Sequence, residues 1–310
     1  MNDPVQLAQD HPPKDQRWIA CMKHFTKYAK HFLENESRNK PITIALIDDG
    51  VDYTDERIAN MVEDGRSYFQ RQSKLIEPFW ASSGGHGTAM ASLIRTVCPV
   101  AKLFVIRLNE YASENGGRQI HPDSAARVIR PTRVGISADN SFPGKSSFCL
   151  KIGAATTWGT AHKSVGTSSN HVDYIFPGHN VVQERGSEQR ADKANLLTGS
   201  SVATAFAAGL AALILRCVQF AAQQLLEEGG KGGGGRSDEM SRHLEDLKTR
   251  ERMQEAFEQI RSITINNTKY VEVWNVFEVP GTKIEDEDPV KEREWALKIA
   301  ERLVGQIRMT

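Results

Sequence analysis

One segment constrains the fold of this chain more than any other, a predominantly apolar stretch from about Ser201 to Glu228. Its spacing predicts a single long helix, and its first turns consist mostly of alanine and other small residues. Small side chains allow a helix to run through a crowded interior in close contact with neighbouring strands. The chain has 310 residues, enough to surround such a helix with other elements. We therefore predict one large α/β domain with an appendage.

The start of this helix carries a candidate nucleophile. Ser201 follows Gly199 and Ser200 in a turn. The first turn of a helix presents unpaired backbone N–H groups and the positive end of the helix dipole, so negative charge that develops there during acyl transfer is stabilised. The same tripeptide is also an ordinary turn and helix N-cap, and the interpretation therefore depends on partners elsewhere in the sequence.

Two upstream segments supply such partners. A strand-like apolar run from Ile44 to Ile47 ends on Asp48 and Asp49, and a glycine follows. Further along, His86 lies between glycines at the head of an apolar helix. The chain order is thus aspartate, histidine, serine, which is the order of the triad in subtilisin.

These three motifs resemble the Asp-x-Gly, His-Gly-Thr and Gly-Thr-Ser-Met-Ala motifs of the subtilisin-like serine peptidases, or subtilases. The resemblance extends over residues 42–215, where Cys98 to Arg107 is similar to the family's strand after the histidine helix. The segments that begin at Ile152 and Val172 are similar to a later strand and to the Ala-Pro-Gly turn. The Gly-Gly-His-Gly-Thr form, followed by Val-Cys-Pro, most resembles intracellular subtilase-like domains of filamentous fungi. The resemblance implies a three-layer α/β fold with a mostly parallel central sheet flanked by helices.

The resemblance also implies a role for each of the three side chains. Ser201 Oγ would attack a carbonyl carbon, His86 would take the serine proton and give it to the leaving amine, and Asp48 would orient the imidazole. Strand ends and helix starts meet at the carboxyl edge of a parallel sheet, which would bring the three together. Asp49 is the weaker candidate because successive strand residues point to opposite faces. It is either a solvated turn residue or a second acid that raises a neighbouring pKa or attracts a cation.

The interval between Leu108 and Asn140 departs from the family pattern. Its roughly thirty residues are scarcely enough for one βαβ unit. We predict one helix over 121–130 and one strand over 133–137, so that one βα unit, with the strand that lines the substrate cleft, is missing. Asn140 falls where the family has its oxyanion asparagine. It is either that donor, alongside the Ser201 backbone N–H, or part of an Asp-Asn turn.

Four parts are predicted along the chain. Residues 1–40 form an N-terminal segment with an amphipathic helix from Arg17 to Leu33. Residues 41–228 form the subtilase-like domain. A glycine-rich linker over 229–237 follows, and residues 238–310 form a C-terminal extension of helices and a strand.

Within this extension, apolar residues at helical spacing predict one helix over 240–260. A β-strand is predicted over Tyr270–Phe277. A terminal helix is marked by four apolar residues, namely Trp295, Ile299, Leu303 and Ile307.

Charge and cysteine content argue against several classes of partner. The 39 basic and 39 acidic residues balance, so no overall field favours nucleic acid or a membrane surface. The 4 cysteines lie far apart and form no zinc or redox motif, and no Asp-rich calcium loop is evident. The first twenty residues lack the apolar region of a secretory signal, and no uninterrupted apolar run is long enough to span a membrane. We therefore expect a cytoplasmic protein that acts on a protein or peptide substrate and has no cofactor.

Two functions from different classes remain open. The first is a serine endopeptidase that cleaves peptide bonds through an acyl-enzyme, with Asp48, His86 and Ser201 as its triad. The second is a catalytically impaired subtilase-like module that binds peptides or proteins, or a truncated gene model. The intact triad favours the first function, and the missing βα unit favours the second.

Overall fold

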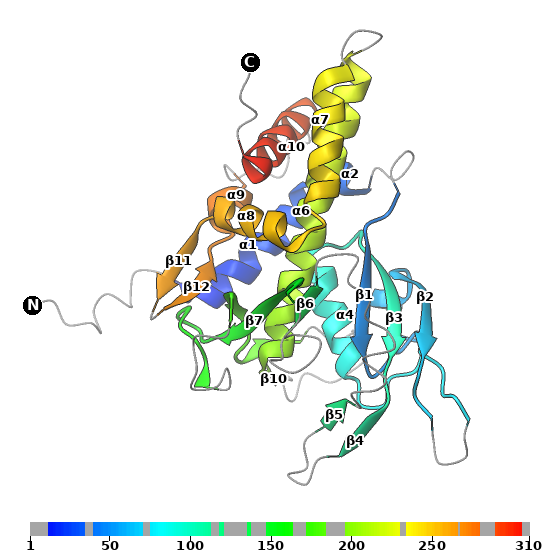
Figure 1. Ribbon diagram of the computed structural model, residues 1–310. Helices are drawn as coiled ribbons and strands as arrows, with labels where there is room; N and C mark the ends of the chain where they lie inside the picture. Colours follow the sequence, from blue (N-terminus) through cyan, green and yellow to red (C-terminus); the bar gives the residue numbers. More distant parts are fainter. Residues whose placement is uncertain are drawn as a thin grey trace, which may run out of the picture.

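The computed structural model describes residues 12–34, 40–70, 75–112, 118–120, 135–137, 147–163, 172–183, 196–229, 234–265, 267–279 and 289–305. Over these residues, helices pack against β-sheets whose longer strands run mostly parallel (Figure 1). The predicted α/β class with mostly parallel strands is confirmed.

A three-stranded parallel sheet carries the first predicted site residue. Its order is β1 (Thr43–Asp48), β3 (Lys102–Arg107), β2 (Val62–Ser67). Parallel strands need crossover connections, and here α3 (Glu56–Ala59) joins β1 to β2 while α4 (His86–Val97) joins β2 to β3. The register pairs the last residue of β1, Asp48, with the last residue of β3.

A second sheet of five strands lies beside the first. Four strands run parallel, and the fifth, β11, is antiparallel to β12. In spatial order they are β11 (Ser262–Ile265), β12 (Thr268–Val271), β8 (Tyr174–Pro177), β7 (Cys149–Ala155) and β6 (Gly135–Ser137).

The sequence predicts one central sheet, but the strands that the structure describes fall into these two. β1 is the edge strand of the first sheet and β6 is the edge strand of the second, and no strand lies between them within the described ranges. The predicted helix over 121–130 lies outside the described residues, and so do the first two residues of the strand predicted over 133–137. The absence of a βα unit therefore stays a prediction.

The predicted long helix forms the centre of the molecule as α6 (Ser200–Gly229). It packs against α4, and it contacts β1 of the first sheet as well as β7 and β8 of the second (Figure 1). By length and composition α6 is apolar enough to cross a membrane, but 78% of its most apolar window is buried inside the fold. Burial of this kind is typical of a core helix.

The predicted N-terminal helix is interrupted near its end, at Ala29, giving α1 (Lys14–Tyr28) and α2 (Lys30–Glu34). Trp18 is fully buried, and its Nε1 donates a hydrogen bond of 3.1 Å to the carbonyl of Val271. The beginning of the described chain is thereby attached to a strand near its end.

The C-terminal part differs from its prediction in three places. The linker predicted over 229–237 is shorter, because α6 extends to Gly229 and α7 (Gly234–Asp246) begins inside the predicted range. The single helix predicted over 240–260 is two helices, since Thr249 caps a separate α8 (Arg250–Ile260). The strand predicted over Tyr270–Phe277 ends at Val271, and α9 (Trp274–Phe277) follows.

These C-terminal elements belong to the main core. β12 pairs with β8, α10 (Pro289–Val304) packs against α6, and their buried apolar residues join one continuous hydrophobic cluster with those of the earlier segments. The region predicted as an extension is thus built into the domain.

Two short antiparallel ribbons complete the described fold. β4 (Glu110–Ala112) and β5 (Arg118–Ile120) form one, and β9 (Val181–Val182) and β10 (Leu196–Leu197) form the other. β10 leads directly into the turn that precedes Ser201.

Candidate active site

Three elements deliver the predicted triad to the carboxyl edge of the first sheet. Asp48 is the last residue of β1, His86 is the first residue of α4, and Ser201 is the second residue of α6. Asp48 is held by strand pairing, because the backbone N–H of Leu108 donates to its carbonyl at 3.0 Å. The fold therefore converts three distant sequence positions into one cluster.

The three side chains form a continuous hydrogen-bonded chain. His86 Nδ1 lies 2.9 Å and 2.8 Å from the two carboxylate oxygens of Asp48, and Nε2 lies 3.0 Å from Ser201 Oγ. A carboxylate only accepts hydrogen bonds, so this geometry assigns the proton of the neutral imidazole to Nδ1 and leaves Nε2 to accept from the serine hydroxyl. The structure thus brings together the three predicted residues.

Burial differs along this chain of groups. Only 8% of the Asp48 side chain is exposed, whereas 36% of the His86 side chain is exposed. The carboxylate is therefore shielded from water, while the imidazole and the serine are accessible to a bound substrate. A buried carboxylate beside an imidazole stabilises the imidazolium that forms when the base takes a proton.

Two glycines, Gly50 and Gly87, allow the loop after β1 and the first turn of α4 to approach closely. A Cβ on Gly87 would lie 2.1 Å from the carbonyl oxygen of Gly50, so the first turn of α4 can rest directly on the loop after β1. Gly50 has a φ of +96°, and a Cβ there would lie 2.4 Å from the carbonyl oxygen of Ala81. Asp52 N–H then donates to Thr88 Oγ1 at 2.9 Å and ties this loop to the helix.

Asp49 lies in an environment that the sequence did not reveal. The interpretation as a solvated turn residue is wrong, because the residue is fully buried. Its carboxylate accepts hydrogen bonds from the backbone N–H groups of Gly84, His86 and Gly87, at 2.9, 3.3 and 2.7 Å. The donors lie more than thirty residues downstream, so neighbouring sequence could not identify them.

The start of α6 presents backbone N–H groups that can donate to an anion. Ser201 lies in the first turn of α6, where backbone N–H groups lack intrahelical acceptors. The second candidate donor, Asn140, lies outside the described residues. The structure therefore does not test that prediction.

A pair of histidines follows the ends of two strands of the second sheet. The rings of His162 and His179 stack with centroids 4.5 Å apart. Burial lowers the pKa of His162, and the neighbouring His179 and Lys163 lower it further. The lowered pKa favours the neutral form of His162, and the pair lies outside the hydrogen-bonded chain of Asp48, His86 and Ser201.

The cysteines do not compete with Ser201 as nucleophiles. All four are free thiols, and three of them are buried. Burial raises the pKa of Cys98 to about 12 and also raises the pKa of Cys217. Since the thiolate is the reactive form, both remain unreactive at neutral pH.

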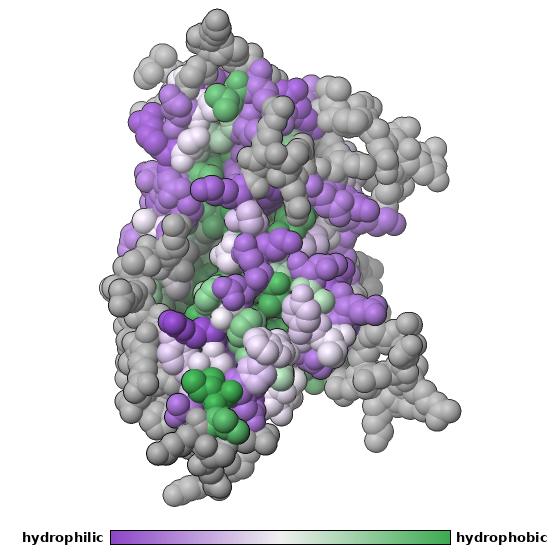
Figure 2. All heavy atoms as spheres, turned by 90° about the vertical axis from the view of Figure 1, so that its right-hand side faces the viewer, coloured by the Kyte–Doolittle hydropathy of each residue, from purple (hydrophilic) through white to green (hydrophobic). Residues whose placement is uncertain are grey.

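The surface near the site is mostly polar with apolar exceptions. Figure 2 shows the side of the molecule that bears β2, where hydrophilic side chains predominate and a compact hydrophobic patch lies near the lower end. Residues before α4 contribute exposed apolar side chains, among them Leu75, Ile76 and Trp80. Trp80 is attached to the loop after β1, because its carbonyl accepts from the N–H of Tyr53 at 3.2 Å.

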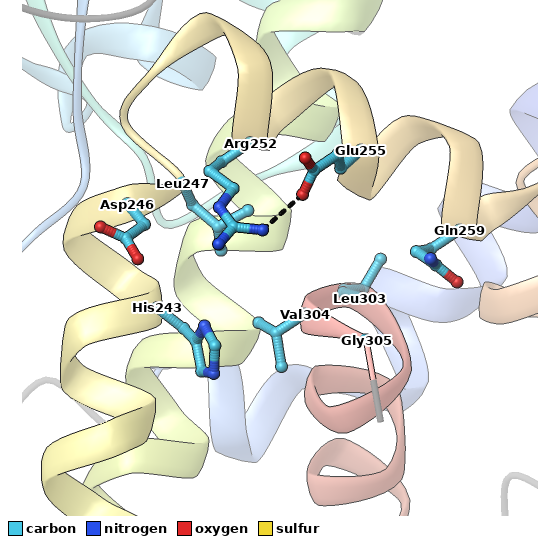
Figure 3. Close-up of a pocket in the computed structure, with 9 residues that line it drawn as sticks. All are labelled: His243, Asp246, Leu247, Arg252, Glu255, Gln259, Leu303, Val304 and Gly305. Carbon is cyan, nitrogen blue, oxygen red and sulfur yellow. Dashed lines mark hydrogen bonds and ion pairs between the residues drawn. The ribbon is translucent and has the colours of Figure 1, made fainter. Parts of the chain in front are cut away.

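A pocket lies elsewhere, between α7, α8 and α10 (Figure 3). It is lined mainly by polar side chains, including the Arg252–Glu255 ion pair at 2.6 Å. No triad residue lines it. Among the described residues, no three His, Cys, Asp or Glu side chains lie close enough together to hold a metal ion.

Fold and site together define an α/β protein with an aspartate–histidine–serine chain at a sheet edge. No family model and no curated protein matches the sequence. Among solved structures, the chain is similar to the MycP3 protease from the type VII (ESX-3) secretion system, with 18% identity, a TM-score of 0.42, and coverage of 66% of this chain and 78% of the other. It is similar to a lanthipeptide protease, with 13% identity, a TM-score of 0.46, and coverage of 83% and 94%. It is also similar to a chain of the subtilase cytotoxin SubAB assembly, with 14% identity, a TM-score of 0.49, and coverage of 94% and 98%.

Proposed function

We propose that this chain is a subtilisin-like serine endopeptidase that hydrolyses peptide bonds in protein or peptide substrates. The observation that carries the proposal is the hydrogen-bonded chain from Asp48 through His86 to Ser201 Oγ. A serine hydroxyl within reach of a base that is itself oriented by a third group is the geometry of an activated nucleophile.

The first half of the reaction forms an acyl-enzyme. Ser201 Oγ attacks the scissile carbonyl carbon while its proton moves to His86 Nε2, and the negative charge develops on the carbonyl oxygen. The Ser201 backbone N–H and the helix dipole of α6 stabilise that charge. His86 then protonates the amine as the C–N bond breaks, which leaves the acyl group on Ser201.

The second half releases the acid product. A water molecule gives a proton to His86 and attacks the ester carbon. The C–O bond to the serine then breaks, and the proton returns to Ser201 Oγ. Asp48 keeps its charge throughout, because its contribution is to orient and stabilise the imidazolium.

Active-site labelling tests this proposal directly. A fluorophosphonate reacts with an activated serine, so the wild-type protein should be labelled and Ser201→Ala should not. Ser200→Ala is the matched control because it removes the adjacent hydroxyl on the same helix and leaves the triad intact. Turnover of a mixed peptide library, followed by mass spectrometry, should depend on Ser201 in the same way.

The opposite outcome has a definite meaning. Protein that melts cooperatively and yet is not labelled would refute the peptidase proposal. A non-catalytic module that binds peptides is the second candidate function, and one observation favours it. Within the described ranges no strand lies between β1 and β6, and a peptide substrate normally pairs with a sheet edge for positioning.

A further inference from the structure

Asp49, the second acid of the Asp48-Asp49-Gly50 segment, lies against the N-terminus of α4, the helix that begins with His86. Its carboxylate accepts three backbone N–H groups from the first turn of α4 and the loop before it, with Asp49 Oδ2 bound by Gly84 and His86 and Oδ1 bound by Gly87. The usual N-cap position is occupied by Gly85, which makes no side-chain cap. Asp49 thus supplies from another segment the acceptor that an N-cap side chain normally provides.

Charge strengthens this contact. A negative group close to a helix N-terminus is stabilised by the helix dipole, and Asp49 is fully buried there. Little space remains around it, because a Cβ on Gly87 would lie 3.0 Å from its Oδ1. These hydrogen bonds and close contacts therefore fix the position of the first turn of α4 relative to the Asp49 carboxylate.

Asp49 also contacts Asp48, the carboxylate that is hydrogen-bonded to the His86 ring. The backbone N–H of Asp49 donates to Asp48 Oδ1 at 2.8 Å, and that oxygen also accepts from His86 Nδ1 at 2.9 Å. Strand alternation explains both contacts, since Asp48 points toward the imidazole while Asp49 points toward the helix start. One residue thus fixes the carboxylate through its backbone and the imidazole through its side chain.

We propose that Asp49 is a positioning residue that sets the placement of His86 between Asp48 and Ser201. This inference rests on the proposed peptidase function. His86 Nε2 is 3.0 Å from Ser201 Oγ, and displacement of α4 by a fraction of an ångström changes that distance directly. A misplacement of about 1 Å can reduce catalysis by about 10²-fold.

Asp49→Asn is the most informative substitution. It keeps the size of the side chain, but it turns an amide NH₂ toward backbone donors and removes the charge. We expect kcat and the second-order rate of fluorophosphonate labelling to fall by about 10²-fold, with KM changed little. Asp52→Asn is the matched control, because it makes the same chemical change in the same loop at an exposed position. It should retain wild-type rates.

A spectroscopic readout separates positioning from simple stability. The proton on His86 Nδ1 gives a far-downfield ¹H NMR signal when it is bound to Asp48, and this signal should shift or broaden in Asp49→Asn at a temperature where the protein is folded. Asp49→Ser serves as a second variant if the asparagine form does not fold, since one hydroxyl can still accept from one N–H group. It should fold and show a reduced kcat together with an altered signal.

The results distinguish this inference from the function on which it rests. Folded Asp49→Asn or Asp49→Ser with wild-type kcat and an unchanged Nδ1 signal would overturn it while wild-type labelling upholds the peptidase. A loss of rate that matches only the loss of folded protein would also overturn it. If the wild type itself is not labelled, the peptidase proposal fails, and the Nδ1 signal alone then decides whether Asp49 positions the imidazole.

Discussion

At the scale of single residues, the site is a chain of hydrogen bonds that runs from Asp48 through His86 to Ser201. Asp48 accepts both from the His86 ring and from the Asp49 backbone, so its orientation is determined from two directions. Ser201 receives its orientation from the start of α6. The proposed nucleophile is therefore hydrogen-bonded to groups that are themselves held in place by neighbouring atoms.

Asp48→Asn tests the role of the buried carboxylate. The amide keeps the shape of the side chain but donates through its NH₂, which favours the imidazole tautomer with its proton on Nε2. That tautomer cannot accept the serine proton. We expect kcat to fall by about 10⁴-fold while the melting temperature changes little. The measurement is single-turnover acylation of the purified variant, and acylation within tenfold of wild type would contradict the assigned tautomer.

The triad could be predicted from the sequence because its members lie in three short motifs whose order along the chain matches that of the subtilisin triad. A strand end, a glycine-flanked histidine and a Gly-Ser-Ser turn are each common when taken singly, and only their combination in this order identifies the three residues. The environment of Asp49 could not be predicted, because its partners lie on a segment that only the fold brings close. Its neighbours in sequence equally suit a solvated turn.

At the scale of elements, the packing of α4 against α6 determines the distance between base and nucleophile. His86 begins one helix and Ser201 lies at the start of the other. The two helices approach closely at Gly209, where an added Cβ would lie 2.9 Å from the Cβ of Val97 and 3.1 Å from the carbonyl oxygen of Ile94. Any larger side chain there must separate the helices.

Gly209→Leu should therefore reduce activity and stability together. The added volume forces the helices apart, which costs about 1–3 kcal/mol in unfolding free energy and shifts the histidine relative to the serine. Thermal melting and the labelling rate measure the two effects. Gly235→Ala is the control, because no atom lies within 4 Å of its added Cβ. A leucine variant with wild-type melting and labelling would show that this helix contact does not set the site geometry.

An acidic side chain links the C-terminal elements to the second sheet. Glu258 on α8 accepts from Tyr174 Oη at 2.8 Å and from Lys269 Nζ at 2.5 Å, and it also accepts from Ser262 Oγ. Burial raises its pKa, but the hydrogen bonds from Lys269, Ser262 and Tyr174 outweigh burial and hold the pKa below its usual value. The ionised form is thus favoured in the folded state.

The sign of the pH effect follows from this lowered pKa. Ionised Glu258 stabilises the fold above the unfolded pKa of about 4.3, and this contribution is lost as the pH falls through the lower folded value. The wild type should have a higher melting temperature than Glu258→Gln at pH 7. The difference between the two melting temperatures should disappear as the pH is reduced below about 4. Melting curves from pH 7 to 3 measure it, with the exposed Glu255→Gln as control. A difference that is independent of pH would assign the effect to packing.

Prediction of elements succeeded where a periodic pattern was long and failed where tertiary contacts decide the boundary. The helix from 201 to 228 is long and uniform, and the structure has it almost unchanged. The strand that starts before Tyr270 stops at Val271, because the next apolar residues turn into α9 and pack Trp274 and Phe277 inward. A short run of apolar residues can be buried either as a strand or as one turn of helix, and the apolar pattern alone does not distinguish the two.

At the scale of the whole molecule, the N- and C-terminal parts of the described chain share one core. Phe25 on α1 contacts Phe277 with ring centroids 4.9 Å apart and contacts Trp295 at 5.2 Å. β12 extends the sheet to which β7 and β8 belong. The separate extension predicted from the glycine-rich segment is therefore replaced by a single packed unit.

Removal of residues 230–310 should prevent folding. The truncated chain 1–229 would expose Tyr174, Phe176 and Trp18, all of which are fully buried in the complete structure. We expect aggregation or a non-cooperative thermal transition, measured by sedimentation and calorimetry. Coexpression of the two pieces should restore soluble protein, because their interface is the native core. A monomeric 1–229 chain that melts cooperatively and is labelled by a fluorophosphonate would contradict this expectation.

The packing of α6 against elements of both sheets has a consequence for mechanics. Asp48 and His86 belong to the first sheet and its helix, whereas Ser201 lies on a helix that also packs against the second sheet. Side-chain packing resists sliding less stiffly than a continuous ladder of backbone hydrogen bonds does. The hydrogen bond between His86 Nε2 and Ser201 Oγ therefore joins two helices that are held together by side-chain packing, so a displacement of α4 along α6 changes its length while both helices stay folded.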